Sequence, residues 1–270
     1  MITSYSSLVW YNVTHEVINV VEKHQIYIPC FGDMRTLHIY TPDAYATSNK
    51  RFPVLYMYDG HNLFYDEDAT FGKCWGLKRY LEVQNIPLIV VGIECNHEGY
   101  KRLEEFSPYD FTDTNIGDIH GRGEALMQWV CDDLKKWIDR KYRTLPSRRH
   151  TGIAGSSMGG LMALYTICHH NETFSKAACL SPFLFGLKKE VDQEIVHASL
   201  SKDTHIYVSW GSDEFRSKNQ LAKASIRLLE ITRMLEHHQV HVYPNMIFKG
   251  RHAEESWEKE LPICIPFLFP

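Results

Sequence analysis

Short runs of apolar residues recur along the chain and alternate with longer stretches in which apolar and polar residues mix. Runs this short and this apolar are typical of strands that are buried on both faces of a sheet. The predicted strands are 52–58, 86–93, 150–154, 177–181 and 204–210, with a more polar one at 240–248. The remaining stretches predict helices at 74–84, 122–142, 161–165 and 217–237, and at 253–269 a helix interrupted by Pro262 and Pro266. This alternation indicates an α/β fold with a mostly parallel central sheet and helices on both faces.

Two segments depart from this alternation. Residues 17–29 and 34–41 carry β-branched and aromatic residues in partial alternation, which predicts an antiparallel N-terminal edge of the sheet. Residues 94–121 show neither a helical nor a strand period. We expect a long loop there that flanks the active site, with aromatic side chains such as Phe106 and Phe111 lining a pocket. A surface excursion held in place by these aromatics is the alternative.

The length and charge of the chain limit its class. With 270 residues, 44% of them hydrophobic, residues 1–270 can form a single α/β domain. The net charge is −4 and the charged residues of both signs are interspersed, so we expect a small-molecule partner, with no nucleic acid and no membrane. The sequence is compatible with a homo-oligomer as well as with a monomer. Residues 1–10 lack a signal-peptide pattern and no apolar run approaches a membrane span, so we expect a cytoplasmic protein.

Cysteines, histidines and acids were considered as metal ligands. The 7 cysteines are scattered and include no C-x-x-C pair, which argues against a disulfide framework and a structural zinc site. Metal catalysis is the competing chemistry, because the chain has 15 histidines and an acidic stretch at 66–68. It contains no H-E-x-x-H or comparable pairing, so the acids fit a solvated loop. We expect no metal and no cofactor.

The hexapeptide Gly155-Ser-Ser-Met-Gly-Gly160 lies between a predicted strand and a predicted helix. It fits G-x-S-x-G, the sharp turn that exposes a nucleophilic serine in α/β-hydrolases, and Ser157 is the proposed nucleophile. Strand and helix pass so close at this turn that a side chain at Gly155 or Gly159 would collide. A phosphate-binding turn would need Lys-Ser/Thr after the glycines or a G-x-G-x-x-G, and neither is present.

An oxyanion hole is predicted where strand 52–58 ends in Asp59-Gly60-His61-Asn62. In this fold the loop after the third strand supplies one of the two backbone donors. We expect the N–H groups of His61, with Asn62 as the adjacent candidate, and of Met158 to hold the oxyanion. An ordinary Asp-Gly turn is the alternative.

An acid and a histidine follow the serine in the chain order that this fold uses. The strand 204–210 is followed by Gly211-Ser-Asp-Glu214, and the strand 240–248 by Gly250-Arg-His252. His252 is selected as the base because it lies in a glycine-flanked loop after the last strand. For the acid, the loop spacing Gly-x-x-acid favours Glu214, whereas the commoner residue type favours Asp213.

Together with the segment Tyr58–Phe64, Trp257 and Leu261, these motifs resemble the putative-esterase family of α/β-hydrolases. That family includes enterochelin (siderophore) esterases, feruloyl esterases and S-formylglutathione hydrolases. The resemblance runs from about residue 52 to the end and is greatest to the siderophore-esterase branch, although the chain lacks room for the extra N-terminal domain of the larger enterochelin esterases. It implies Ser157 as nucleophile, His252 as base and Glu214 as acid.

The motifs predict a serine carboxylic-ester hydrolase that forms an acyl-enzyme on Ser157. Two alternatives stay open. An acyltransferase would use the same triad to pass the acyl group to an alcohol or sugar, and a non-catalytic binding protein would keep the fold alone. Three alternatives also remain for the acid: Glu214, Asp213, or a Ser-His pair that works without an acid. The acyl and leaving groups depend on pocket shape, which the sequence does not give.

Overall fold

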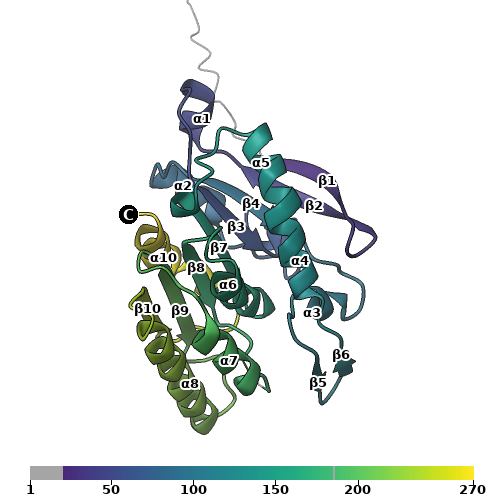
Figure 1. The fold of residues 1–270 in the computed structure, drawn as a ribbon, viewed down its shortest axis with the longest axis vertical. Helices are drawn as coiled ribbons and strands as arrows, with labels where there is room; N and C mark the ends of the chain where they lie inside the picture. Colours follow the sequence, from purple (N-terminus) through teal and green to yellow (C-terminus); the bar gives the residue numbers. More distant parts are fainter. Residues whose placement is uncertain (1–20, 185) are drawn as a thin grey trace, which may run out of the picture.

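A computed structural model describes residues 21–184 and 186–270 of the chain. An eight-stranded sheet runs through its centre in the order β1-β2-β4-β3-β7-β8-β9-β10 (Figure 1). The strands are β1 Glu22–Ile28, β2 Asp33–Tyr40, β3 Val54–Tyr58, β4 Ile89–Ile93, β7 Thr151–Ser156, β8 Lys176–Leu180, β9 His205–Gly211 and β10 His241–Ile247. The six strands from β4 to β10 pair in parallel, and β1 and β2 form an antiparallel edge. The predicted fold class is confirmed, although residues 17–20 and the segment tested for a signal peptide lie outside the described residues.

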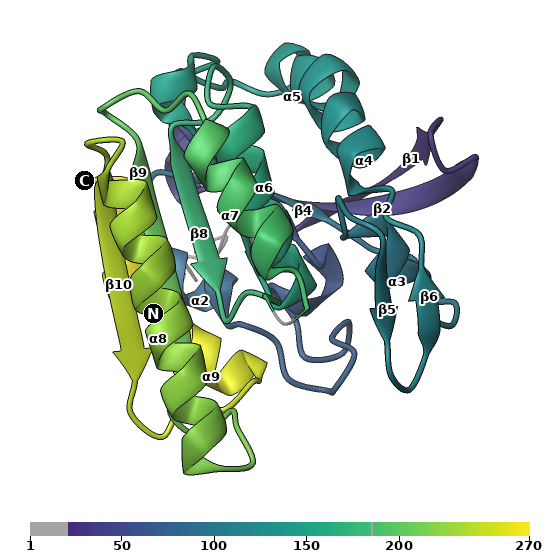
Figure 2. The ribbon, with the colours of Figure 1, turned by 60° about the horizontal axis from the view of Figure 1, so that its bottom comes forward.

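The central strands are apolar because both faces of the sheet are covered. Every residue of β3, β4, β7 and β8 is buried. One core cluster packs α4, α5, α6, α7 and α8 on one face, and a second packs α2, α9 and α10 on the other (Figure 2). These helices are α2 Leu77–Val83, α4 Gly123–Trp129, α5 Lys135–Lys141, α6 Met158–His169, α7 Lys188–His197, α8 Lys218–Glu236, α9 Glu254–Glu258 and α10 Leu261–Leu268.

The predicted helix at 122–142 exists, with a π-helical segment in its middle. The π-helical segment η2, Val130–Leu134, joins α4 to α5, so the three segments form one continuous helix. Its apolar residues still point to one side, since Leu126, Val130, Leu134 and Ile138 are all at most 1% exposed. The amphipathic pattern therefore predicted the buried face correctly.

The prediction of a loop without secondary structure over 94–121 is wrong in part. The segment contains a short helix, α3 Lys101–Glu105, and a hairpin of β5 Phe111–Asp113 and β6 Gly117–Ile119. Elements of three to five residues are too short to show a period. A side chain fixes the hairpin turn, because the Asp113 carboxylate accepts the backbone N–H groups of Asn115 and Ile116.

The C-terminal segment forms two helices, α9 and α10, and the two prolines do not break it as expected. Pro262 lies in the first turn of α10, where its missing N–H has no helical partner to lose, and Pro266 lies inside the same helix. The break falls at Lys259 and Glu260 instead. None of the helices in 21–184 and 186–270 has the length and apolar character needed to cross a bilayer.

Candidate active site

The turn between β7 and α6 holds Ser157 in a strained backbone conformation, with φ of 56° and ψ of −119°. A Cβ atom on Gly155 would lie 2.6 Å from the carbonyl of Gly159, and one on Gly159 would lie 2.9 Å from Cβ of Tyr58. The two glycines are therefore required by the close approach of strand and helix. The Ser157 N–H donates to the Leu180 carbonyl at 3.0 Å, which ties the turn to the end of β8.

Glu214 and His252 form a hydrogen-bonded pair. Oε2 of Glu214 lies 3.1 Å from Nδ1 of His252, and the Glu214 side chain is 4% exposed. Its other oxygen, Oε1, accepts hydrogen bonds from the Ser181 hydroxyl and the Gly211 N–H, each at 2.5 Å. Asp213, the alternative acid, is an exposed residue whose carboxylate accepts from the Ser212 hydroxyl. Of the two predicted acids, the geometry brings Glu214 to His252.

Two further side chains hold this pair, and sequence reasoning missed the first of them. Ser181 follows β8 and donates to Glu214, while its own oxygen accepts the indole N–H of Trp257 at 3.1 Å. The Trp257 ring in turn packs edge-on against the His252 ring, with centroids 5.2 Å apart. The position of Ser181 directly after a buried strand was the available signal.

The loops after β9 and β10 touch, which is why the acid and the histidine meet. A Cβ atom on Gly211 would lie 2.2 Å from the Gly250 carbonyl oxygen and 2.9 Å from the Glu214 carboxylate. The Asp213 N–H donates to the same carbonyl at 2.8 Å. Glycine at 211 thus permits the contact between the two loops.

The two predicted oxyanion donors come from different elements. His61 lies in the short 3-10 helix η1, Gly60–Asn62, and Met158 is the first residue of α6. The first N–H groups of a helix have no partner within it, so that of Met158 is directed out of the helix end. The N–H of Asn62, the adjacent candidate for an oxyanion donor, already donates to the Asp59 carbonyl at 2.9 Å. Gly60 is required here, because a Cβ atom would lie 2.5 Å from the backbone of Gly92.

Two cavities are each lined by both Ser157 and His252. The first, of about 530 Å³, lies on the Glu214 side and has aromatic and basic lining residues, namely Phe183, Trp210, Phe215, Arg216 and Lys223. The second, of about 300 Å³, lies on the His61 side and includes Cys95, His97 and Arg102. Sequence reasoning missed the two basic residues of the first cavity, since nothing in their spacing distinguishes them from surface charges.

The segment 94–121 borders both cavities, through Asn115 in the first and Cys95 to Arg102 in the second. Of the two roles predicted for its aromatic residues, the structure favours the one in which they hold the segment in place. Phe106 is 1% exposed and packs edge-on against Tyr58 at 4.9 Å, and Phe111 packs against Phe183 at 5.5 Å. These rings anchor the segment, and the aromatic lining of the first cavity comes from Phe183, Trp210 and Phe215 in other parts of the chain.

Burial and a neighbouring charge shift the pKa values of two groups beside the site. Burial lowers the pKa of the His61 imidazole to about 4, against an opposing effect of the Asp59 carboxylate, so the ring is neutral near pH 7. Asp59 itself is 4% exposed and accepts two 2.7 Å hydrogen bonds from Arg102. That guanidinium outweighs burial and holds the pKa of Asp59 below its usual value.

Comparisons with known proteins agree with this architecture. Ferri-bacillibactin esterase BesA from Bacillus subtilis is 28% identical over 194 residues, which span 63% of this chain and 62% of that protein. Two solved structures share the fold. An IroE-like serine hydrolase from Shewanella oneidensis has a TM-score of 0.73 at 16% identity, covering 91% of this chain and 78% of that one. The siderophore hydrolase EstA from Aspergillus nidulans has a TM-score of 0.72 at 16% identity, covering 97% and 100%.

The family described as "Putative esterase" matches residues 29–268, nearly the whole of the described chain. This range includes every predicted site residue and all strands of the eight-stranded sheet except β1. The resemblance stated from the sequence motifs is confirmed. The chain belongs to this putative esterase family and is an ester hydrolase with an α/β-hydrolase fold.

Proposed function

We propose that the protein is a serine carboxylic-ester hydrolase that works through an acyl-enzyme on Ser157. The observation that carries the proposal is that a strained-turn serine, Ser157, lines the same two cavities as His252, which is hydrogen-bonded to Glu214. Three groups from three different loops, arranged in this way, are the parts of a serine-hydrolase triad.

Each group has a defined role in the reaction. His252 takes the hydroxyl proton of Ser157 at Nε2 as the oxygen attacks the ester carbonyl, and the N–H groups of His61 and Met158 hold the oxyanion. The proton then passes from Nε2 to the leaving alkoxide, which departs as the alcohol. Water repeats the same steps and releases the acid from Ser157. Glu214 keeps the proton on Nδ1 throughout and stabilises the imidazolium.

The first cavity supports an aromatic, anionic ester as substrate. Phe183 and Phe215 offer apolar surface, and Arg216 and Lys223 offer positive charge, in a space of about 530 Å³. Separately, the relative named ferri-bacillibactin esterase and the structure named siderophore hydrolase suggest siderophore esters as a substrate class. Siderophore-type esters are therefore the first substrates to test.

The experiment is a series of p-nitrophenyl and anionic aryl esters of increasing acyl size, measured with the wild type and Ser157→Ala. We expect the wild type to hydrolyse the series and to prefer the anionic aryl esters, and Ser157→Ala to lose at least roughly 10³-fold in kcat. A serine-directed phosphonylating reagent should inactivate the wild type and add its mass to the peptide that contains Ser157. Equal hydrolysis by both proteins would refute the proposal, and adding candidate alcohols would reveal acyl transfer as an acyl-alcohol product.

A further inference from the structure

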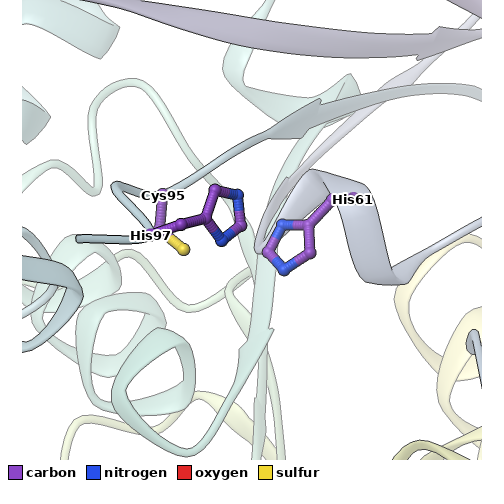
Figure 3. Close-up of side chains that lie close together, drawn as sticks. All are labelled: His61, Cys95 and His97. Carbon is purple, nitrogen blue, oxygen red and sulfur yellow. The ribbon is translucent and has the colours of Figure 1, made fainter. Parts of the chain in front are cut away.

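We propose that His61, Cys95 and His97 form a binding site for a zinc-like divalent cation beside the candidate active site. The three residues come from two segments, η1 and the loop after β4, which face each other in Figure 3. Their candidate ligand atoms all lie within 4.8 Å of one another. A cation site here goes beyond the esterase activity and departs from the expectation that the protein holds no metal.

Both histidines have one ring nitrogen held by a neighbour and the other nitrogen available. Nε2 of His61 lies 2.9 Å from the Thr70 hydroxyl, and its Nδ1 is buried with no hydrogen-bond partner among the described residues. Nε2 of His97 lies 2.8 Å from the Glu94 carboxylate, which leaves Nδ1 as the ligand atom. A buried nitrogen without a partner costs free energy unless something binds it, which is an independent sign of a ligand here.

The surroundings of His97 match the outer shell of known zinc sites. A metal-bound histidine usually donates its other ring N–H to a carboxylate, which fixes the ring and raises its basicity. Glu94 supplies that carboxylate, and its second oxygen is held at 2.8 Å by the imidazole of His38, which is 3% exposed. These two contacts hold both oxygens of the Glu94 carboxylate beside the site.

The donor set and the charge of the site select the kind of ion. Two neutral imidazoles and one thiolate suit zinc and other borderline or soft ions, and three protein ligands leave a fourth position open. Zinc binds cysteine as the thiolate, so the ion must displace the Cys95 proton to the solvent on binding. The thiolate and Glu94 then offset the two charges of the cation, while Asp59 and Arg102 neutralise each other.

The geometry needs only a small adjustment. Tetrahedral zinc holds its ligand atoms roughly 3.3–3.6 Å apart, given bonds of about 2.0 Å to nitrogen and 2.3 Å to sulfur. Separations of up to 4.8 Å therefore close by about 1 Å. His97 is the mobile partner, because its side chain is 52% exposed whereas His61 and Cys95 are buried. All three line the 300 Å³ cavity, which gives an ion a path to them.

The test is Zn²⁺ binding by the metal-free full chain, measured by competition with a chromophoric chelator. We expect one tight site in the wild type, a loss of roughly 100-fold or more in affinity for Cys95→Ser and His97→Gln, and a loss of about 10- to 100-fold for Glu94→Gln. Cys131→Ser and His120→Ala, on exposed or half-exposed residues elsewhere, should bind as the wild type does. Zn²⁺ should also raise the melting temperature of the wild type and not that of Cys95→Ser.

A second readout identifies the sulfur ligand directly. Co²⁺ in place of Zn²⁺ should give a thiolate-to-cobalt charge-transfer band in the wild type and in Cys131→Ser, and none in Cys95→Ser. His97→Gln changes an exposed side chain, so its melting temperature without metal should equal that of the wild type and exclude misfolding. Equal Zn²⁺ binding by the wild type and Cys95→Ser, or no binding tighter than about 0.1 mM by the wild type, would overturn the proposal. Esterase activity enters none of these measurements.

Discussion

Replacing Glu214 by glutamine tests which carboxylate orients His252, and the structure fixes how the new amide must lie. Oε1 of Glu214 accepts the Gly211 N–H, which can only donate, so that position must stay an oxygen. The glutamine NH₂ group then occupies the position of Oε2, 3.1 Å from Nδ1 of His252. Nδ1 has to become the acceptor, and the ring proton moves to Nε2, the nitrogen that must take the proton of Ser157.

The expected loss follows from this change of tautomer. In the Ser-His-Asp triad, the corresponding acid-to-amide change lowers kcat about 10⁴-fold while leaving the geometry intact. For Glu214→Gln we expect a loss of roughly 10³- to 10⁴-fold in kcat, which corresponds to about 4–5.5 kcal/mol of transition-state stabilisation. The KM should change by less than about threefold, because Glu214 does not contact the acyl group in the proposed mechanism.

The assay is steady-state hydrolysis of a p-nitrophenyl ester with Glu214→Gln and Asp213→Asn measured in parallel. Asp213 is exposed, so its variant should retain activity within about twofold of the wild type. Matching circular dichroism spectra and melting temperatures would show that both variants fold. The reasoning is refuted if Asp213→Asn loses as much activity as Glu214→Gln, or if Glu214→Gln keeps more than about a tenth of the wild-type kcat.

Two further changes test the packing around the site. Gly159→Ala should destabilise the protein by about 1–3 kcal/mol in urea unfolding, because the added Cβ would lie 2.9 Å from Cβ of Tyr58. Helix propensity alone predicts that alanine stabilises the helix, so a stabilised variant would contradict the steric argument. Burial raises the pKa of Glu260 to about 7 against the hydrogen bond from Tyr207, so the folded state holds this proton more tightly than the unfolded state. The proton on Glu260 makes its full contribution to folding stability below the pKa of the unfolded state, and this contribution is lost as the pH rises through 7. The unfolding free energy of Glu260→Gln should therefore rise by about 3 kcal/mol relative to that of the wild type between roughly pH 4 and pH 8. Parallel curves of unfolding free energy against pH for the two proteins would contradict this.

The sheet and the three chemical groups were predictable because each leaves a local pattern. Buried parallel strands read as apolar runs, and a strained turn needs small residues at fixed spacing, as at Gly155 and Gly159. The candidate acid and histidine were predicted from their places after strands, without any knowledge of the distance between them. From the sequence, both Glu214 and Asp213 were candidates for the acid. The structure adds the 3.1 Å contact between Glu214 and His252.

Features that depend on contacts between segments far apart in the chain could not be predicted from the sequence. Ser181 acts through a hydrogen bond to a residue 33 positions later, and Cys95 meets His61 across the gap between two loops. The hairpin after Phe111 is held by single side chains, which leave no period in three-residue strands. Arg216 gains its proposed role in substrate binding only because the fold places it in the lining of the first cavity.

The end of β8 connects the parts of the candidate site, which come from separate supersecondary units. The candidate nucleophile Ser157 belongs to the unit of β7 and α6, whereas β9, α8 and β10 form one βαβ unit that delivers both Glu214 and His252 to the same edge of the sheet. Strand β8 lies between β7 and β9 in the sheet order. Its last carbonyl, at Leu180, accepts the N–H of Ser157, and the next residue, Ser181, donates to Glu214. Two consecutive residues of β8 and its loop therefore set the position of the serine and of the carboxylate relative to one another, and a shift of this strand end would disturb both at once.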